Sequence, residues 1–232
     1  MGHLHAHWHE VTERYDTIII DEAQDLSPTW ITLLTQLLDP PGPRRLLVVA
    51  DLSQQVYARG FTVPSTDDGW TLCELTANCR NTFNIASLLR HRFNGAIAPV
   101  GGPESEDVRW IEAADADALV DAVGEALDHL EDRDHAAPSL LVATFTRSVR
   151  DRLRAQYGFV RWEDREPMAI VCETVHRVKG LEYDHVILVV HDDDVKDELL
   201  YVGASRAVMS LAVIGSTAIR DRLGLPVPKS HG

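Results

Sequence analysis

The most constraining feature of the chain is a short run of β-branched residues that ends in acidic ones. Residues 18–25 read IIIDEAQD. The isoleucines predict a buried β-strand, whose carboxyl end then carries Asp21 and Glu22, and ligands of parallel α/β sheets bind at such ends. Carboxylate oxygens are preferred Mg²⁺ ligands, and a second acid beside the first can orient or deprotonate a water molecule. The segment therefore suggests nucleotide hydrolysis, although an apolar strand ending in Asp-Glu is by itself only suggestive.

A second apolar segment follows at the spacing of a parallel α/β unit. Ser27-Pro28 and the following TWITLLTQLL predict a capped amphipathic helix that ends at the loop PPGP. RLLVVAD then predicts a second buried strand, which ends in Asp51. Because parallel strands end at the same edge of a sheet, we expect Asp51 and Gln54 beside Asp21.

The rest of the chain predicts a second α/β unit. LCELTANCRN at 72–81 is expected to form a short strand and turn. Residues 61–74 are expected to form a surface loop, and GAIAPVGGPESED at 95–107 has the composition of a linker or a long loop. The predicted strands are 139–145, 168–174, 185–190 and 209–215, and the predicted helices are 84–93, 117–130, 148–156 and 196–207.

Composition narrows the class of protein. The net charge of −14 argues against a generally basic nucleic-acid surface, but it leaves room for a narrow basic track. The sequence has no apolar run long enough for a bilayer and no secretory signal, so we expect a cytoplasmic protein without a membrane partner. Cys73, Cys79 and Cys172 lack metal-type spacing and fit a reducing compartment. The alternating His3, His5, His7 and His9 are expected to be a tail, with metal binding as the minor alternative.

Five segments, taken together and in order, resemble motifs two to six of the UvrD/Rep-type superfamily 1 DNA helicases. They are DEAQD at 21–25, ADLSQQVY at 50–57, LTANCRN at 75–81, TVHRVKGLEYDHVILV at 174–189 and LLYVGASRA at 199–207. The resemblance implies RecA-like parallel sheets with flanking helices, and a motor that uses ATP and Mg²⁺ to move along single-stranded DNA and unwind duplexes. It divides the chain into a tail (1–14), a partial first RecA-like domain (15–76), a second RecA-like domain (77–220) and a C-terminal tail (221–232).

The resemblance also implies roles at the nucleotide. Asp21 is similar to the Mg²⁺ ligand, and Glu22 to the hydrolytic base beside the metal. Gln54 is similar to the residue that senses the γ-phosphate. Arg80 and Arg206 resemble the two arginines that reach this phosphate, where planar guanidinium groups neutralise developing charge.

Further roles follow from the segment at 174–189. Glu182 resembles the acid that contacts the ribose, and Gly180 permits the tight turn before it. Thr174, His176 and Lys179 are expected to face single-stranded DNA. Tyr57 stands where the family's third motif turns towards DNA. Taken singly, Arg80, Glu182 and His176 have ordinary structural explanations, namely a surface ion pair, a solvated acid and a hydrogen-bonded histidine.

The sequence departs from the family pattern in three respects that matter, and one of them is that fewer than a hundred residues separate Arg80 from Thr174, too few for the large accessory domain that longer members insert there. It contains no GxxxxGK[ST] phosphate loop, so we expect a truncated helicase, with a separate chain as a possible source of that loop. The third motif lacks the aromatic that follows the tyrosine in the family, so DNA stacking is expected to be weaker unless Phe61 or Trp70 substitutes. The alternatives are a non-hydrolysing DNA- or protein-binding module that keeps the motor fold, and a gene remnant without function.

Overall fold

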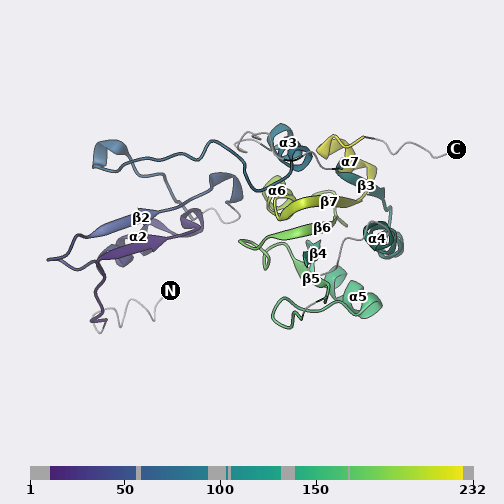
Figure 1. Cartoon of the computed structure of the whole chain (residues 1–232), viewed down its shortest axis with the longest axis horizontal. Helices are drawn as coiled ribbons and strands as arrows, with labels where there is room; N and C mark the ends of the chain where they lie inside the picture. The colour runs from purple at the N-terminus through teal and green to yellow at the C-terminus, as the bar shows by residue number, and fades with distance from the viewer. Residues whose placement is uncertain are drawn as a thin grey trace. The chain divides into compact units, whose positions relative to one another are not determined.

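The computed structural model describes residues 11–55, 59–93, 103, 106–131, 139–166 and 168–226. The chain forms two compact units, which we call unit 1, up to Cys73, and unit 2, from Glu74 onward. Figure 1 shows both units. The predicted site residue Tyr57 and the histidines of the N-terminal tail lie outside the described residues.

Unit 1 is built on two parallel strands joined by a helix. Strand β1 (Thr17–Ile20) pairs with β2 (Arg45–Val48), so that Ile19 lies opposite Leu47. Helix α2 (Pro28–Thr35) connects them and begins where Ser27 is extended and Pro28 occupies the first turn. The 3-10 turns η2 (Ala23–Asp25) and η3 (Leu52–Gln54) follow β1 and β2, and a third, η4 (Thr66–Asp68), lies in the segment 61–74.

The expectation that both strands of unit 1 are buried is wrong for one face of the sheet. Ile20 packs with Ala23 and Phe61 in a small core, whereas Ile19 is 65% exposed and Leu47 is 53% exposed. Strands of parallel sheets are normally covered on both faces, and among the described residues of unit 1 only one face is covered. Because Phe61 belongs to the core, its ring is not presented for stacking on a base.

Unit 2 contains a five-stranded, fully parallel sheet in the order β3-β7-β6-β4-β5. Helices α4 and α5 cover one face of this sheet, and α3, α6 and α7 cover the other (Figure 1). The strands are β3 (Arg109–Glu112), β4 (Leu140–Thr144), β5 (Val171–Thr174), β6 (Tyr183–Val189) and β7 (Ala207–Gly215). The helices are α3 (Phe83–Arg92), α4 (Ala116–Glu131), α5 (Arg147–Tyr157), α6 (Asp197–Ala204) and α7 (Thr217–Leu223).

The predicted fold class, α/β with parallel sheets and flanking helices, is confirmed. The four strands and four helices predicted after residue 83 are present. The edge strand β3 was not predicted, and residues 72–81 form no regular strand. No helix within the described ranges has the length and apolarity needed to cross a membrane.

Candidate functional site

The acidic turn of unit 1 begins directly after β1. Asp21 is exposed, and its Oδ1 accepts a hydrogen bond of 2.8 Å from the backbone N–H of Glu22. Glu22 adopts the left-handed conformation, with φ 51° and ψ 38°. This conformation is uncommon for residues other than glycine and costs about 1 kcal/mol or more, so it persists only where neighbouring contacts fix it.

Gln24 supplies those contacts. It is fully buried, and its Nε2 donates to Glu22 Oε2 while its Oε1 accepts from the backbone N–H of Asp51 at 3.0 Å. Asp51 Oδ2 in turn accepts a 2.7 Å hydrogen bond from Gln54 Nε2. The structure therefore places Asp51 and Gln54 at the same sheet edge as the acidic turn, and the buried amide of Gln24 joins the two strand ends.

Three segments far apart in the sequence converge in unit 2. Arg80 Nε lies 2.5 Å from Glu182 Oε1, and both side chains are nearly half exposed. Two residues assigned to the nucleotide from different motifs are thus brought together as a surface ion pair. An exposed pair contributes at most about 1 kcal/mol, so it can separate when another anion or cation competes.

Asn81 and Arg206 bind these segments together in the interior. Asn81 is buried and its Nδ2 donates to the carbonyl oxygen of Ala207, immediately after Arg206. Arg206 is 1% exposed, and it donates from Nε to Val202 O (2.9 Å), from Nη1 to Leu181 O (3.1 Å) and from Nη2 to Ser205 Oγ (2.9 Å). Arg206 would have to leave these acceptors to contact a phosphate.

The residues predicted to face DNA lie in the segment that follows β5. Thr174 ends the strand and is buried, His176 is exposed, and Lys179 is partly buried. Gly180 has φ 82°, a left-handed conformation that favours glycine, and so it makes the turn before Glu182. The described members of this set therefore share one loop, Thr174 to Gly180, which we call the β5–β6 loop.

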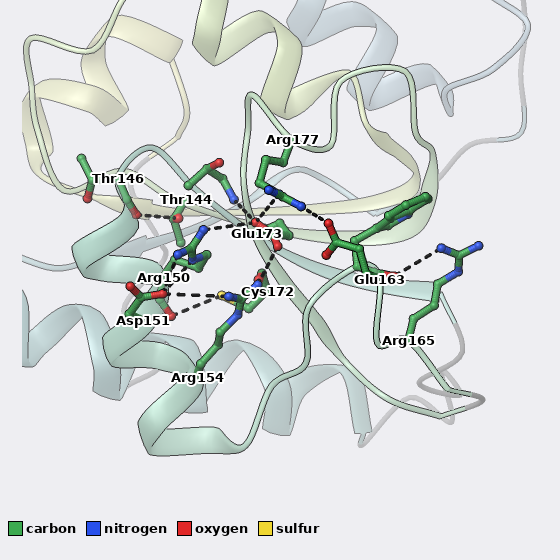
Figure 2. A network of polar contacts seen from close by, with 12 residues as sticks. Thr144, Thr146, Arg150, Asp151, Arg154, Glu163, Arg165, Cys172, Glu173 and Arg177 are labelled. Carbon is green, nitrogen blue, oxygen red and sulfur yellow. Dashed lines mark hydrogen bonds and ion pairs between the residues drawn. The ribbon is translucent and has the colours of Figure 1, made fainter.

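The residue before this loop, Glu173, is the centre of a polar network (Figure 2). Its side chain is 1% exposed. Arg154 Nη2 lies 2.7 Å from Glu173 Oε1, and Arg150 Nη1 and Arg177 Nε each lie 3.5 Å from Oε2. A buried carboxylate is stable only when it is paired, and here three guanidinium groups pair it.

The neighbouring Cys172 gives a testable consequence of this burial. Burial raises the pKa of its thiol to about 12, whereas Cys73 and Cys79 are exposed. Because the thiolate is the reactive form, we expect a disulfide reagent at pH 8 to modify Cys73 and Cys79 quickly and Cys172 only after unfolding. Mass spectrometry of the labelled peptides measures this. Rapid labelling of Cys172 in the native protein would contradict the packing of β5.

Asp21 fits a magnesium ion in the manner expected for a nucleotide site. No group of three or more histidine, cysteine or acidic side chains is gathered for a metal in the described parts of the chain. Mg²⁺ bound with a nucleotide, however, needs only one or two carboxylates, because water and phosphate oxygens complete its shell. The exposed carboxylate of Asp21 at the end of a parallel strand meets that requirement.

Sequence reasoning missed Asn81 and the Glu173 network. The signal for the network was an acid inside the apolar strand MAIVCET, together with the arginines of SVRDRLRAQ spaced four residues apart. A charged residue in a strand predicted to be buried needs a partner, and the i, i+4 arginines share one helix face. Asn81 carried no comparable signal, because its distant partners are the backbone carbonyl groups of Ser205 and Ala207.

Two family models match the chain. The UvrD/REP helicase N-terminal domain matches residues 4–61, and the UvrD-like helicase C-terminal domain matches residues 169–214. A solved structure described as the C-terminal domain of a possible DNA helicase from Lactobacillus plantarum is 19% identical, with a TM-score of 0.47 over 59% of this chain and 86% of that one. No curated protein sequence matches.

Proposed function

We propose that the chain, in which UvrD/REP helicase family models match residues 4–61 and 169–214, takes part in ATP-driven movement along single-stranded DNA and in unwinding. The observation that carries the proposal is the convergence in unit 2 of the segments around Arg80, Glu182 and Arg206. These residues come from three separate motifs, and their meeting in unit 2 is what a shared nucleotide site would require.

In this proposal unit 1 contributes the acidic part of the chemistry. Asp21 would hold Mg²⁺, which supplies positive charge to the phosphate oxygens when it is bound. Glu22 accepts a proton from, or orients, the attacking water, and the hydrogen bond from Gln24 fixes its carboxylate. We assign Gln54, whose Nε2 donates to Asp51, to reporting the state of the phosphate.

Unit 2 contributes the cationic part, in which Arg80 and Arg206 have different roles. Arg80 is exposed and is the residue available to a γ-phosphate. Arg206 is buried, and its bond to Leu181 O ties the turn that carries Gly180 and Glu182 to β7. We assign Arg80 to charge neutralisation and Arg206, in the arrangement seen here, to holding the turn for ribose contact.

The sequence carries no phosphate loop, so the proposal gives its residues only the acid and arginine part of the nucleotide chemistry. The backbone amides and lysine of a phosphate loop would complete this nucleotide chemistry, and a separate chain is one candidate source of them. The exposed thiols of Cys73 and Cys79, together with a DNA substrate, favour the cytoplasm as the setting.

Binding of a fluorescent ATP analogue with Mg²⁺ to the purified chain tests the proposal. We expect Arg80→Ala and Asp21→Asn each to weaken binding about fivefold to tenfold, because each removes one charge-assisted contact. Arg152→Ala is the matched control, since Arg152 is similarly exposed in unit 2 and pairs with Asp117 on another helix.

Two results would contradict the proposal. Equal nucleotide affinities for the parent chain and Arg80→Ala would show that Arg80 does not contact the nucleotide. A chain shown to be folded that binds no nucleotide would leave a non-hydrolysing module as the better interpretation, and DNA affinity that does not change with added nucleotide would support that alternative.

A further inference from the structure

The proposed mechanism makes no use of Glu173, although this residue is the most completely buried acid of unit 2 that the structure describes. It stands next to the end of β5, opposite Ala143 of β4, where an apolar side chain would pack well. Replacing a buried ion pair with apolar residues is often neutral or stabilising. Protein stability alone therefore does not explain why residue 173 is a glutamate. A role in positioning neighbouring groups gives a stronger reason.

The carboxylate of Glu173 contacts both helix α5 and the β5–β6 loop. Arg150 and Arg154 of α5 hold it from one side, with side chains that are mostly buried. On the other side Glu173 Oε2 accepts a 3.2 Å hydrogen bond from the backbone N–H of Thr174 and lies 3.5 Å from Arg177 Nε. Figure 2 shows Glu173 between the arginines of α5 and Arg177. The loop is therefore anchored through Glu173 to a helix on one face of the sheet.

Arg177 differs from the other two arginines in its exposure. Its side chain is 51% exposed, and its Nη2 pairs with the exposed carboxylate of Glu163. Its backbone N–H donates to Thr174 O at 2.8 Å, which closes a tight turn at the start of the loop. Arg177 thus stands beside His176 with its Nε held by a buried acid and its outer nitrogen paired with an acid at the surface.

We propose that Glu173 is a positioning residue that holds Arg177 as a further contact to the phosphates of single-stranded DNA. The inference rests on the proposed function, because it assumes that the β5–β6 loop faces DNA. A planar guanidinium group suits a phosphate oxygen pair, and the exposed Glu163 is a partner that a phosphate can replace. Glu173 keeps the group oriented when this exchange takes place.

The variant Glu173→Gln separates positioning from simple electrostatics by the sign of its effect. The substitution removes one negative charge, so electrostatics alone would strengthen binding of a fluorescent oligothymidine. Positioning predicts about fivefold weaker binding at moderate salt, together with a dependence of log K on log salt that is shallower by about 0.7, the contribution of one phosphate on a single strand. Tighter binding, or an unchanged slope, would overturn the proposal.

A double-mutant cycle tests whether the effect runs through Arg177. We expect Arg177→Ala to match Glu173→Gln in affinity and slope, and the double variant to be no weaker than either single one. Additive losses would show that Glu173 acts on DNA affinity by another route. Arg152→Ala is again the control, because it removes a charge from α5 without touching Glu173.

The variant Arg177→Lys serves if Glu173→Gln does not fold. It lies at an exposed position, keeps the positive charge and loses the guanidinium Nε that faces Glu173. Affinity close to that of Arg177→Ala is expected, and parental affinity would overturn the positioning role.

A nuclear magnetic resonance measurement separates failure of this inference from failure of the proposed function. The Arg177 Nε–Hε resonance is expected to shift in Glu173→Gln without any DNA. If the parent chain fails to bind the oligonucleotide, the proposed DNA-binding function is wrong, and so is a DNA contact at Arg177. An unshifted resonance in a folded variant overturns the positioning role whatever the chain binds.

Discussion

Replacing Arg206 by alanine is expected to lower the free energy of unfolding of unit 2 by about 3 kcal/mol. Arg206 is among the largest fully buried side chains, and its removal leaves a cavity and takes the donor from Leu181 O. Relief from burying a positive charge offsets part of this loss, which keeps the estimate below the sum of the separate contacts. The variant is therefore unsuitable as a simple test of nucleotide binding.

Hydrogen exchange of peptides from β6 and β7 measures this effect within unit 2. Arg80→Ala is the matched control, because it removes the same side chain from an exposed ion pair and should change stability by less than about 0.5 kcal/mol. Equal protection in the two variants would show that the Arg206 side chain does not hold the turn and β7 together in solution.

Replacing Gly203 by valine is expected to destabilise unit 2 by about 3 kcal/mol, because the space beside this residue is filled. A Cβ atom at position 203 would lie 2.7 Å from Leu188 Cδ1 and 3.1 Å from Val175 Cγ2. Both neighbours are fully buried, and Leu188 belongs to the central strand β6. Helix α6 can therefore approach β6 this closely only if residue 203 has no side chain.

The thermal midpoint of unit 2, followed by near-ultraviolet circular dichroism, measures this change. Valine is a better helix former than glycine, so propensity alone would raise the midpoint of Gly203→Val, and Glu198→Val on the exposed side of the same helix is the control for adding a valine to α6. Gly203→Ala should fall between the two. A midpoint for Gly203→Val equal to that of the control would mean that α6 is not packed on β6 as described.

Much of unit 2 could be predicted from the sequence because periodicity reports burial. The apolar runs of β4 and β6 are long and uninterrupted, and α4 repeats its apolar residues at helical spacing. Strand β3 was missed because its four residues, RWIE, combine charged and large apolar side chains, and they follow a stretch rich in glycine and proline. Its strand character comes from pairing with β7, which is a tertiary effect.

The candidate site was less predictable for a different reason. The motif order predicted roles for Arg80, Glu182 and Arg206, but nothing local to these residues distinguishes an exposed guanidinium from a buried one. The ion pair of Arg80 with Glu182 and the interior position of Arg206 depend on where three distant segments meet. Similarly, the isoleucines of β1 predict burial on both faces, whereas the described residues of unit 1 leave Ile19 exposed.

The strand order of unit 2 has a consequence for its synthesis on the ribosome. Strand β3 is translated first, but its described neighbour in the sheet is β7, which emerges about 95 residues later, or roughly 5–20 s at ordinary elongation rates. Throughout that interval Trp110 and Ile111 lack the strand beside which they are buried. The nascent chain therefore has to keep an unpaired apolar strand from associating with other chains until translation reaches β7, and slower elongation after β6 would lengthen this exposure.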